Sequence, residues 1–121
     1  AVWEDLRSSA NPVALDECCP QDWVEFEGKF WIAAAQDEQT HLYVEDNQSW
    51  VDVSNSLVKV KKLFSDGTSL WGVGDAGHLA RYDGETWCVQ QLAEENLNDI
   101  WGNGTRLYVV GDNNTFMKFD Y

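Results

Sequence analysis

An internal repeat of 37 residues limits the possible folds of this chain more than any other feature of its sequence. The segment 64–75 recurs as 101–112, with each matched residue displaced by 37 positions. The segment 78–83 recurs in the same way as 115–120, and it also occurs 37 positions earlier as 41–46. The chain is therefore expected to contain three copies of one structural unit, of which the first is the most divergent.

Each copy is predicted to form four short strands. In the middle copy, stretches rich in β-branched, aromatic and leucine residues lie at 58–64, 69–73, 78–82 and 87–92. Turn-forming pairs such as Asp66-Gly67 and Asp83-Gly84 separate these stretches. No stretch of about 11 residues or more has apolar residues at helical spacing. The sequence therefore predicts an all-β chain built from antiparallel meanders.

Four-stranded antiparallel units that repeat at about 40 residues are typical of β-propeller blades. The segment 70–87, Leu-Trp-Gly-Val-Gly-Asp-Ala-Gly-His-Leu-Ala-Arg-Tyr-Asp-Gly-Glu-Thr-Trp, resembles the repeat of bacterial Trp-Gly type β-propellers. Blades of that family typically read Val-Trp-Ala-Val-Gly-Asp-Gly-Gly-Thr-Ile-Leu-His-Tyr-Asp-Gly-Thr-Thr-Trp. The likeness is partial in the last copy and weak in the first, where 33–36 reads Ala-Ala-Ala-Gln. It implies a propeller fold with three blades in this chain and no particular activity, because such blades occur in unrelated proteins.

The last copy ends before the strand that carries a tryptophan in the two copies before it. In the middle copy Trp87 lies four residues after Asp83, so its counterpart would lie three residues beyond Tyr121. Trp3 stands at that position if Ala1 is counted directly after Tyr121. The amino-terminal segment is therefore predicted to form the outer strand of the last repeat. We expect a single domain, 1–121, with this outer strand at 1–7 and repeats at about 20–56, 57–93 and 94–121.

Three blades cover only part of a ring, because propellers usually have four to eight. Two blade faces would remain in water. With roughly 500 Å² of mostly apolar surface on each, the cost is on the order of 10 kcal/mol per face, which rivals the stability of a small domain. We therefore predict a homodimer that closes a six-bladed ring, in which each amino-terminal strand completes the last blade of the other chain. Closure within one chain, pairing with a paralogous chain and excision from a longer propeller are the alternatives.

The charge of the chain excludes two classes of partner. It carries 21 acidic and 8 basic residues, for a formal net charge of −13. Such a surface repels phosphate backbones and anionic lipid headgroups, so neither nucleic acid nor a membrane surface is predicted as a partner. No apolar run approaches the roughly 18 residues of a membrane span. No signal-like segment precedes Ala1, so any leader is expected to have been removed already.

Cysteine and histidine usage predicts neither a disulfide framework nor a metal site. Cys18, Cys19 and Cys88 are odd in number, and two of them are adjacent. One bridge from Cys88 to the adjacent pair is an alternative, and buried or half-buried free thiols are the favoured interpretation. His41 and His78 are isolated, and no second cysteine or histidine pair lies at zinc spacing. No cofactor is predicted.

Departures from the repeat period indicate where binding residues lie. Compared with the later copies, about nine extra residues precede Phe26 and about three lie between Trp31 and Leu42. These two kinds of connection lie at the same end of a four-stranded blade, so one face of the molecule carries both insertions. That face is acidic, and it suits a basic or hydroxyl-rich partner, although Asp and Asn also form turns for structural reasons. The predicted binding residues are Asp16, Glu17, Trp23, Asp37, Glu38, Asp75, His78, Asp112 and Asn113.

The sequence favours a non-enzymatic binding module that presents this acidic loop face to a protein partner. A carbohydrate-binding propeller lectin is the alternative, because aromatic faces stack on sugar rings. Tryptophans at repeated positions are first explained by packing between blades, which leaves Trp23 as the one tryptophan that the repeat does not explain. No nucleophile elbow, paired histidines or phosphate-binding glycine loop indicates catalysis. A calcium site among Asp75, Asp112 and nearby carbonyls lacks the spacing of a calcium loop.

Overall fold

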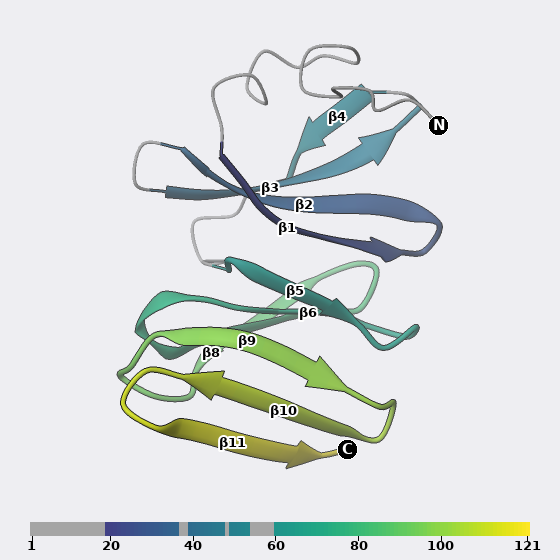
Figure 1. Cartoon of the computed structure of the whole chain (residues 1–121). Coiled ribbons are helices and arrows are strands. Elements are labelled where there is room, and N and C mark those ends of the chain that lie inside the picture. The colour runs from purple at the N-terminus through teal and green to yellow at the C-terminus, as the bar shows by residue number, and fades with distance from the viewer. Residues whose placement is uncertain (1–18, 37–38, 48, 54–59) are drawn as a thin grey trace, which may run out of the picture.

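The computed structural model describes residues 19–36, 39–47, 49–53 and 60–121 (Figure 1). The described residues form eleven strands and one 3₁₀ turn, η1 (Asp75–Gly77). The strands are β1 (Cys19–Phe26), β2 (Lys29–Gln36), β3 (Gln39–Asp46), β4 (Ser49–Asp52), β5 (Lys62–Ser65), β6 (Leu70–Val73), β7 (His78–Tyr82), β8 (Trp87–Gln91), β9 (Leu97–Gly102), β10 (Arg106–Gly111) and β11 (Thr115–Asp120). The predicted outer strand 1–7 lies outside the described residues. No helix within the described ranges is long and apolar enough to cross a membrane.

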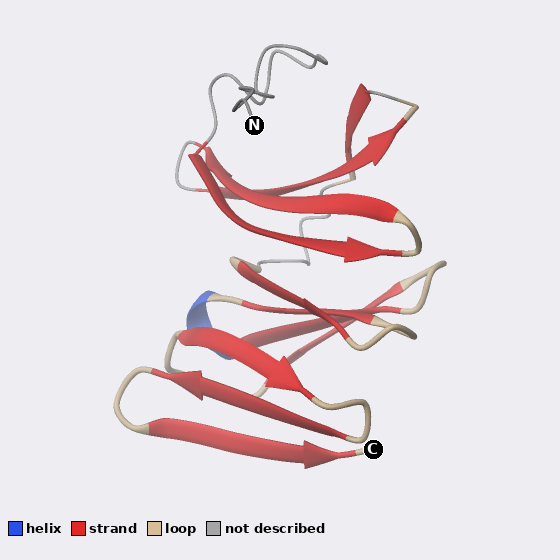
Figure 2. Cartoon of the chain, turned by 45° about the vertical axis from the view of Figure 1, so that its right-hand side comes forward, coloured by secondary structure: helices blue, strands red, loops and turns tan. Residues whose placement is uncertain are grey.

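The strands form three antiparallel sheets in which neighbours along the chain pair with each other (Figure 2). The first sheet has the order β1-β2-β3-β4, the second β5-β6-β7-β8 and the third β9-β10-β11. The prediction of an all-β chain of antiparallel meanders is confirmed. The third sheet has one strand fewer than the others among the described residues.

The pairing register identifies which residues of the three sheets are equivalent. Phe64 on β5 lies opposite Trp71 on β6, and Trp101 on β9 lies opposite Tyr108 on β10. In the first sheet Val24 lies opposite Trp31. The first strands of the sheets therefore match with Val24, Phe64 and Trp101 at one position, and with Trp23, Leu63 and Ile100 at the position before it.

The insertion between Trp31 and Leu42 lengthens the strands and not the connection between them. Strands β2 and β3 have eight residues each, whereas β6 and β7 have four and five. In the middle copy, β5 begins at Lys62, later than the predicted start at residue 58. Val60 instead packs over Gly72, and a Cβ atom at Gly72 would lie 2.8 Å from a methyl carbon of Val60.

Short polar side chains fix the turns at which the repeats show Asp or Asn. The Asp66 carboxylate accepts hydrogen bonds from the backbone N–H groups of Thr68 and Ser69, at 2.8 and 2.7 Å. Its counterpart Asn103 accepts one from the N–H of Arg106 at 3.0 Å. In the turn after β7, the Asp83 carboxylate accepts hydrogen bonds from the backbone N–H groups of Thr86 and Glu85. These hydrogen bonds hold the pKa of its carboxyl below the usual range.

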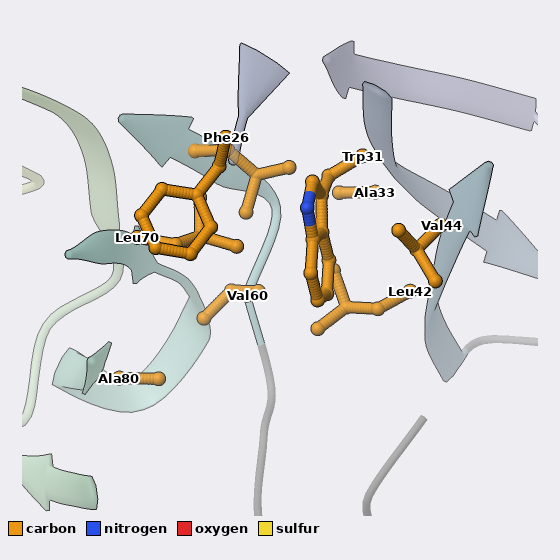
Figure 3. Packing of buried hydrophobic residues seen from close by; sticks show 9 residues of the cluster. Phe26, Trp31, Ala33, Leu42, Val44, Val60, Leu70 and Ala80 are labelled. Carbon is orange, nitrogen blue, oxygen red and sulfur yellow. The ribbon is translucent and has the colours of Figure 1, made fainter. Parts of the chain in front are cut away.

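The three sheets are stacked, and neighbouring sheets approach each other most closely along their first strands, β1 on β5 and β5 on β9 (Figure 1). A core cluster lies between the first and second sheets, with Phe26, Trp31 and Leu42 on one side and Leu70 and Ala80 on the other (Figure 3). A second cluster lies between the second and third sheets, and its buried members are Trp71, Val73, Leu97, Ile100, Leu107 and Val109. Two of the three core clusters therefore lie between successive sheets, and the third, formed by Ala34, Tyr43 and Trp50, lies on the other side of the first sheet.

A carboxylate also joins the first sheet to the second. Asp22 on β1 accepts a hydrogen bond from the backbone N–H of Leu63 on β5, at 2.8 Å. The sheet order leaves β5 at the edge of its sheet, so this N–H finds its acceptor in the neighbouring sheet.

Replacing this carboxylate is expected to weaken the contact between the two sheets. The substitution Asp22→Ala leaves the Leu63 N–H without its acceptor, and we expect the free energy of unfolding to fall by roughly 1–3 kcal/mol. Urea denaturation measures this difference. Gln21→Ala, an exposed position on the same strand, serves as the control and is expected to change the free energy by less than about 0.5 kcal/mol. Equal effects of the two substitutions would show that the hydrogen bond contributes nothing.

An aromatic contact joins the second sheet to the end of the third. The Tyr121 hydroxyl donates to a carboxylate oxygen of Asp66 at 2.7 Å, and Trp71 Nε1 donates to the same oxygen at 3.1 Å. The rings of Trp71 and Tyr121 lie 5.8 Å apart. Partial desolvation acts to raise the pKa of Asp66, but the hydrogen bonds that it accepts, led by that of Tyr121, hold it below its usual range. Desolvation and this hydrogen bond raise the pKa of Tyr121 to about 12.

The lowered pKa of Asp66 predicts a stability that decreases in acid. The unfolded chain takes up a proton at the ordinary aspartate pKa of about 4, before the folded chain does, so the contribution is present above that pH and is lost as the pH falls through the lower folded value. In Asp66→Asn, whose amide oxygen still accepts the turn hydrogen bonds, the free energy of unfolding is expected to fall less steeply between neutral pH and about pH 3. Urea denaturation across this range gives the two slopes, and equal slopes would contradict the prediction.

Candidate functional site

Three chain connections meet at one end of the second and third sheets. They are η1 with its flanking residue at 74–77, the β8–β9 connection at 92–96 and the β10–β11 turn at 111–114. We call these three segments together the loop face. Asn96 ties them together, because its side-chain oxygen accepts from the Ala76 N–H at 3.0 Å and its carbonyl accepts from the Asp112 N–H at 2.9 Å. The Leu97 N–H donates to the Gly74 carbonyl at 3.0 Å. The loop face is thus held by hydrogen bonds between its own segments.

Asp75, Asp112 and Asn113 lie within this loop face and His78 lies next to it, and each also has a structural role. Asp75 forms an ion pair with Lys61 at 2.8 Å, and its own side chain is 70% exposed. His78 Nδ1 lies 2.7 Å from the Asp75 carbonyl oxygen. Asp112 accepts a hydrogen bond from the Asn98 side chain at 2.8 Å, and Asn113 has a positive φ of 55° in the turn.

The other predicted binding residues are not part of the described loop face. Asp16, Glu17, Asp37 and Glu38 lie outside the described residues. Trp23 lies within β1, with its side chain 63% exposed and its ring 5.4 Å from that of Phe30, in an edge-to-face arrangement.

The repeat does explain Trp23, contrary to the sequence-based expectation. The strand register places it at the position of Leu63 and Ile100, which are 7% and 4% exposed because each faces the sheet before its own. The first sheet has no described sheet before it, so the same position is open to solvent. The sequence comparison missed this equivalence because the first copy is shifted out of the 37-residue period.

Two outer sheet faces expose aromatic side chains. On the third sheet, Trp101 and Phe116 are 59% and 67% exposed, and their rings lie 6.4 and 6.0 Å from that of Tyr108. We call Trp101, Tyr108, Val110 and Phe116 the third-sheet face. On the opposite side of the stack, Trp23 and Phe30 form the first-sheet face.

The first-sheet face continues into a buried cluster. Ile32 lies opposite both Trp23 and Tyr43, so these three residues share one side of the sheet. Tyr43 is fully buried in a cluster with Ala34 and Trp50. Among the described residues, the exposed large apolar side chains on this side are those of Trp23 and Phe30, on the first two strands.

Trp101 is a candidate residue that the sequence analysis did not identify. Its counterpart Phe64 is packed between the second and third sheets, where a Cβ atom added to Gly102 would lie 3.1 Å from the Phe64 ring. The available signal was the shared repeat position, because a residue buried between sheets in one copy is exposed in the last copy.

A groove of about 410 Å³ lies between the outer strands of the second and third sheets. Its lining is largely apolar and includes Trp71, Leu79, Arg81, Cys88, Met117 and Phe119. Cys88 is an exposed free thiol, so the interpretation of this cysteine as buried or half-buried is wrong.

The described residues contain no group of three or more His, Cys, Asp or Glu side chains arranged to hold a metal ion. Comparison with protein-family models, with curated proteins and with solved structures finds no match to this chain.

Proposed function

We propose that this chain is a non-enzymatic binding module, in which two copies close a six-bladed β-propeller that presents its loop faces to a protein partner. The observation that carries the proposal is the equivalence of buried and exposed positions along the stack. Leu63 and Ile100 are buried between sheets, whereas Trp23, at the equivalent position of the first sheet, is exposed. Phe64 is packed between sheets, whereas Trp101, at the equivalent position of the third sheet, is exposed.

The way in which the sheets meet supports a radial arrangement. Neighbouring sheets are closest at their first strands, and the groove opens between the outer strands of the second and third sheets. Sheets that meet at an inner strand and separate toward the outer strand surround an axis, as propeller blades do.

The two outer faces suit each other as the buried faces do. Each sheet has one side that faces the preceding sheet in the chain and one side that faces the following sheet. At both described interfaces, the following side of one sheet packs on the preceding side of the next. The third-sheet face is the following side of the last sheet, and the first-sheet face is the preceding side of the first sheet. A second copy would place these two faces in contact at two equivalent seams, giving a ring of six sheets within the usual range.

The same equivalence assigns a role at the seam to Asp99. The register places Asp99 on β9 at the position of Asp22 on β1. The Asp99 carboxylate now accepts from the N–H of Ile100, its own neighbour, at 2.9 Å. Across the seam it would accept from the Trp23 N–H of the second copy, as Asp22 does from Leu63.

The loop face is suited to a basic partner. Its acidic side chains include Asp75, Glu94, Glu95 and Asp112, in a chain with a net charge of −13. The hydrogen bonds of Asn96 hold its segments in place, so little ordering is needed when a partner binds. Attraction between this face and lysine or arginine side chains favours association with a basic protein segment.

An array of lysine- and arginine-rich peptides tests this function. We expect binding that weakens as salt is raised and that falls by about tenfold in Glu94→Gln/Asp112→Asn, because both charges are removed while the hydrogen-bonding capacity remains. Glu85→Gln, an exposed change in the turn at the other end of the sheets, is the control and is expected to bind as the original chain does.

A glycan array provides the opposing outcome. Carbohydrate binding accompanied by a change in tryptophan fluorescence, without peptide binding, would favour a lectin and contradict recognition of a protein. Peptide binding that is insensitive both to salt and to the double substitution would also contradict the proposed role of the loop face.

A further inference from the structure

Among the described residues, the third sheet ends in β11, whose outer edge pairs with no described strand. The first and second sheets continue from their third strands to β4 and β8, whereas the described part of the third sheet stops at β11. An edge strand of this kind can pair with an additional strand through its backbone N–H and C=O groups.

An aromatic cluster shows what the fourth strand contributes where it is present. Between the first and second sheets, the ring of Trp31 lies 5.2 Å from that of Tyr82 and 6.4 Å from that of Trp87. Trp87 lies on the fourth strand β8, opposite Tyr82, and the two rings are 5.0 Å apart. The fourth strand thus inserts a tryptophan between two sheets.

Two members of this cluster have counterparts between the second and third sheets. Trp71 corresponds to Trp31, and Phe119 corresponds to Tyr82. Both line the groove, and Phe119 is 55% exposed. The counterpart of Trp87 would lie opposite Phe119, on a strand beside β11, with its ring in the groove.

We propose that the segment 1–7 of a second copy of this chain binds along β11 and places the Trp3 indole in the groove against Trp71 and Phe119. This inference rests on the proposed ring and specifies how its seam is held. It commits to a particular strand register, because β8 pairs with β7 in a known register that can be transferred to β11.

The transferred register pairs side chains of suitable chemistry. With Trp3 opposite Phe119, Glu4 falls opposite Lys118 and Leu6 falls opposite Phe116. Opposite charges and apolar pairs at facing positions stabilise neighbouring antiparallel strands. The repeat arithmetic that aligned Trp3 with Trp87 did not use these two pairs, so they support the register independently.

The order of the sheets identifies the segment as that of a second copy. In the described chain the fourth strand of one sheet leads into the first strand of the next sheet, as β8 leads into β9. The segment 1–7 leads into β1, so it belongs to the sheet that precedes the first sheet. In the proposed ring that sheet is the third sheet of the second copy, whereas within one chain the second sheet separates the first from the third (Figure 1).

Disulfide trapping tests the segment, its register and its source together. The variant carries Glu4→Cys and Lys118→Cys, with Cys18, Cys19 and Cys88 replaced by serine. Facing residues on antiparallel strands have Cα atoms about 4.5–5.5 Å apart, which is within the range of a disulfide. Under mild oxidation we expect most of the protein to run as a linked two-chain species on a non-reducing denaturing gel. The control pairs Glu4→Cys with Asp120→Cys, two residues out of register, and is expected to give at least fivefold less.

A disulfide within one chain would overturn the exchange of the segment, and absence of any disulfide would overturn the pairing with β11. The mass of the unmodified chain in solution separates these failures from failure of the ring. A two-chain mass without trapping would refute the segment and leave the ring in place. A one-chain mass without trapping would refute both.

Discussion

The substitution Trp101→Glu is expected to convert a two-chain particle into separate folded chains. Trp101 exposes 59% of its surface on the third-sheet face, and its counterpart Phe64 is packed between sheets. A carboxylate there would be buried against the first-sheet face without a partner, which is costly. Loss of a large buried aromatic side chain from an interface commonly weakens it by about 2 kcal/mol or more, and the buried charge adds to this cost, so we expect the dissociation constant to rise by about 100-fold or more.

Sedimentation velocity over a dilution series measures this change, and circular dichroism shows whether the separated chains keep their strands. Val51→Ser is the control, because Val51 is also an exposed apolar residue, 41% exposed, but lies on the outer strand β4. It is expected to leave the dissociation constant within about threefold of the original. A Trp101→Glu chain that remains paired at the same concentrations would show that the third-sheet face does not form the seam.

The second large effect is expected at Gly77, where two segments of the loop face, η1 and the connection at 92–96, are in close contact. Gly77 has a φ of +73°, and a Cβ atom there would collide with the carbonyl group of Ala93. The Gly77 carbonyl also accepts a hydrogen bond from the Leu92 N–H at 2.8 Å, so the two segments cannot separate freely. We expect Gly77→Ala to lower the free energy of unfolding by about 3–5 kcal/mol or to prevent folding.

Gly67→Ala is the matched control for this substitution. Gly67 has a φ of +90°, but no atom lies within 4 Å of the added Cβ position. Its loss is expected to be about 1–2 kcal/mol, from backbone strain alone. Urea denaturation of both variants gives the difference, and equal losses would contradict a close approach between η1 and the connection at 92–96.

The repeat predicted the strands well because a strand depends mainly on local patterning. The expected stretches 78–82 and 87–92 correspond to β7 and β8, with an end shifted by one residue in β8. Within β5 the prediction was poorer, because Val60 serves to pack over Gly72 rather than to pair in the sheet. Side-chain contacts between stacked sheets cannot be predicted from the residue pattern of a single strand.

The candidate site was only partly predictable. Asp75 and Asp112 could be placed at one end from strand order, but the Asn96 network depends on which backbone groups approach each other after folding. Sequence distance alone places Trp23 outside the repeat, because equivalence in the divergent first copy follows from the pairing register. The exposure of Trp101 arises from its place in the last sheet, although its type suits a buried position.

The mass of the particle in solution is the most direct test of the central proposal, that the outer faces of the stack are covered by a second copy. Sedimentation equilibrium of the 121-residue chain at micromolar concentration is expected to give twice the 13.8 kDa mass of one chain. It is expected to show dissociation only on strong dilution. A folded particle of one chain mass across the whole concentration range would contradict the proposed ring.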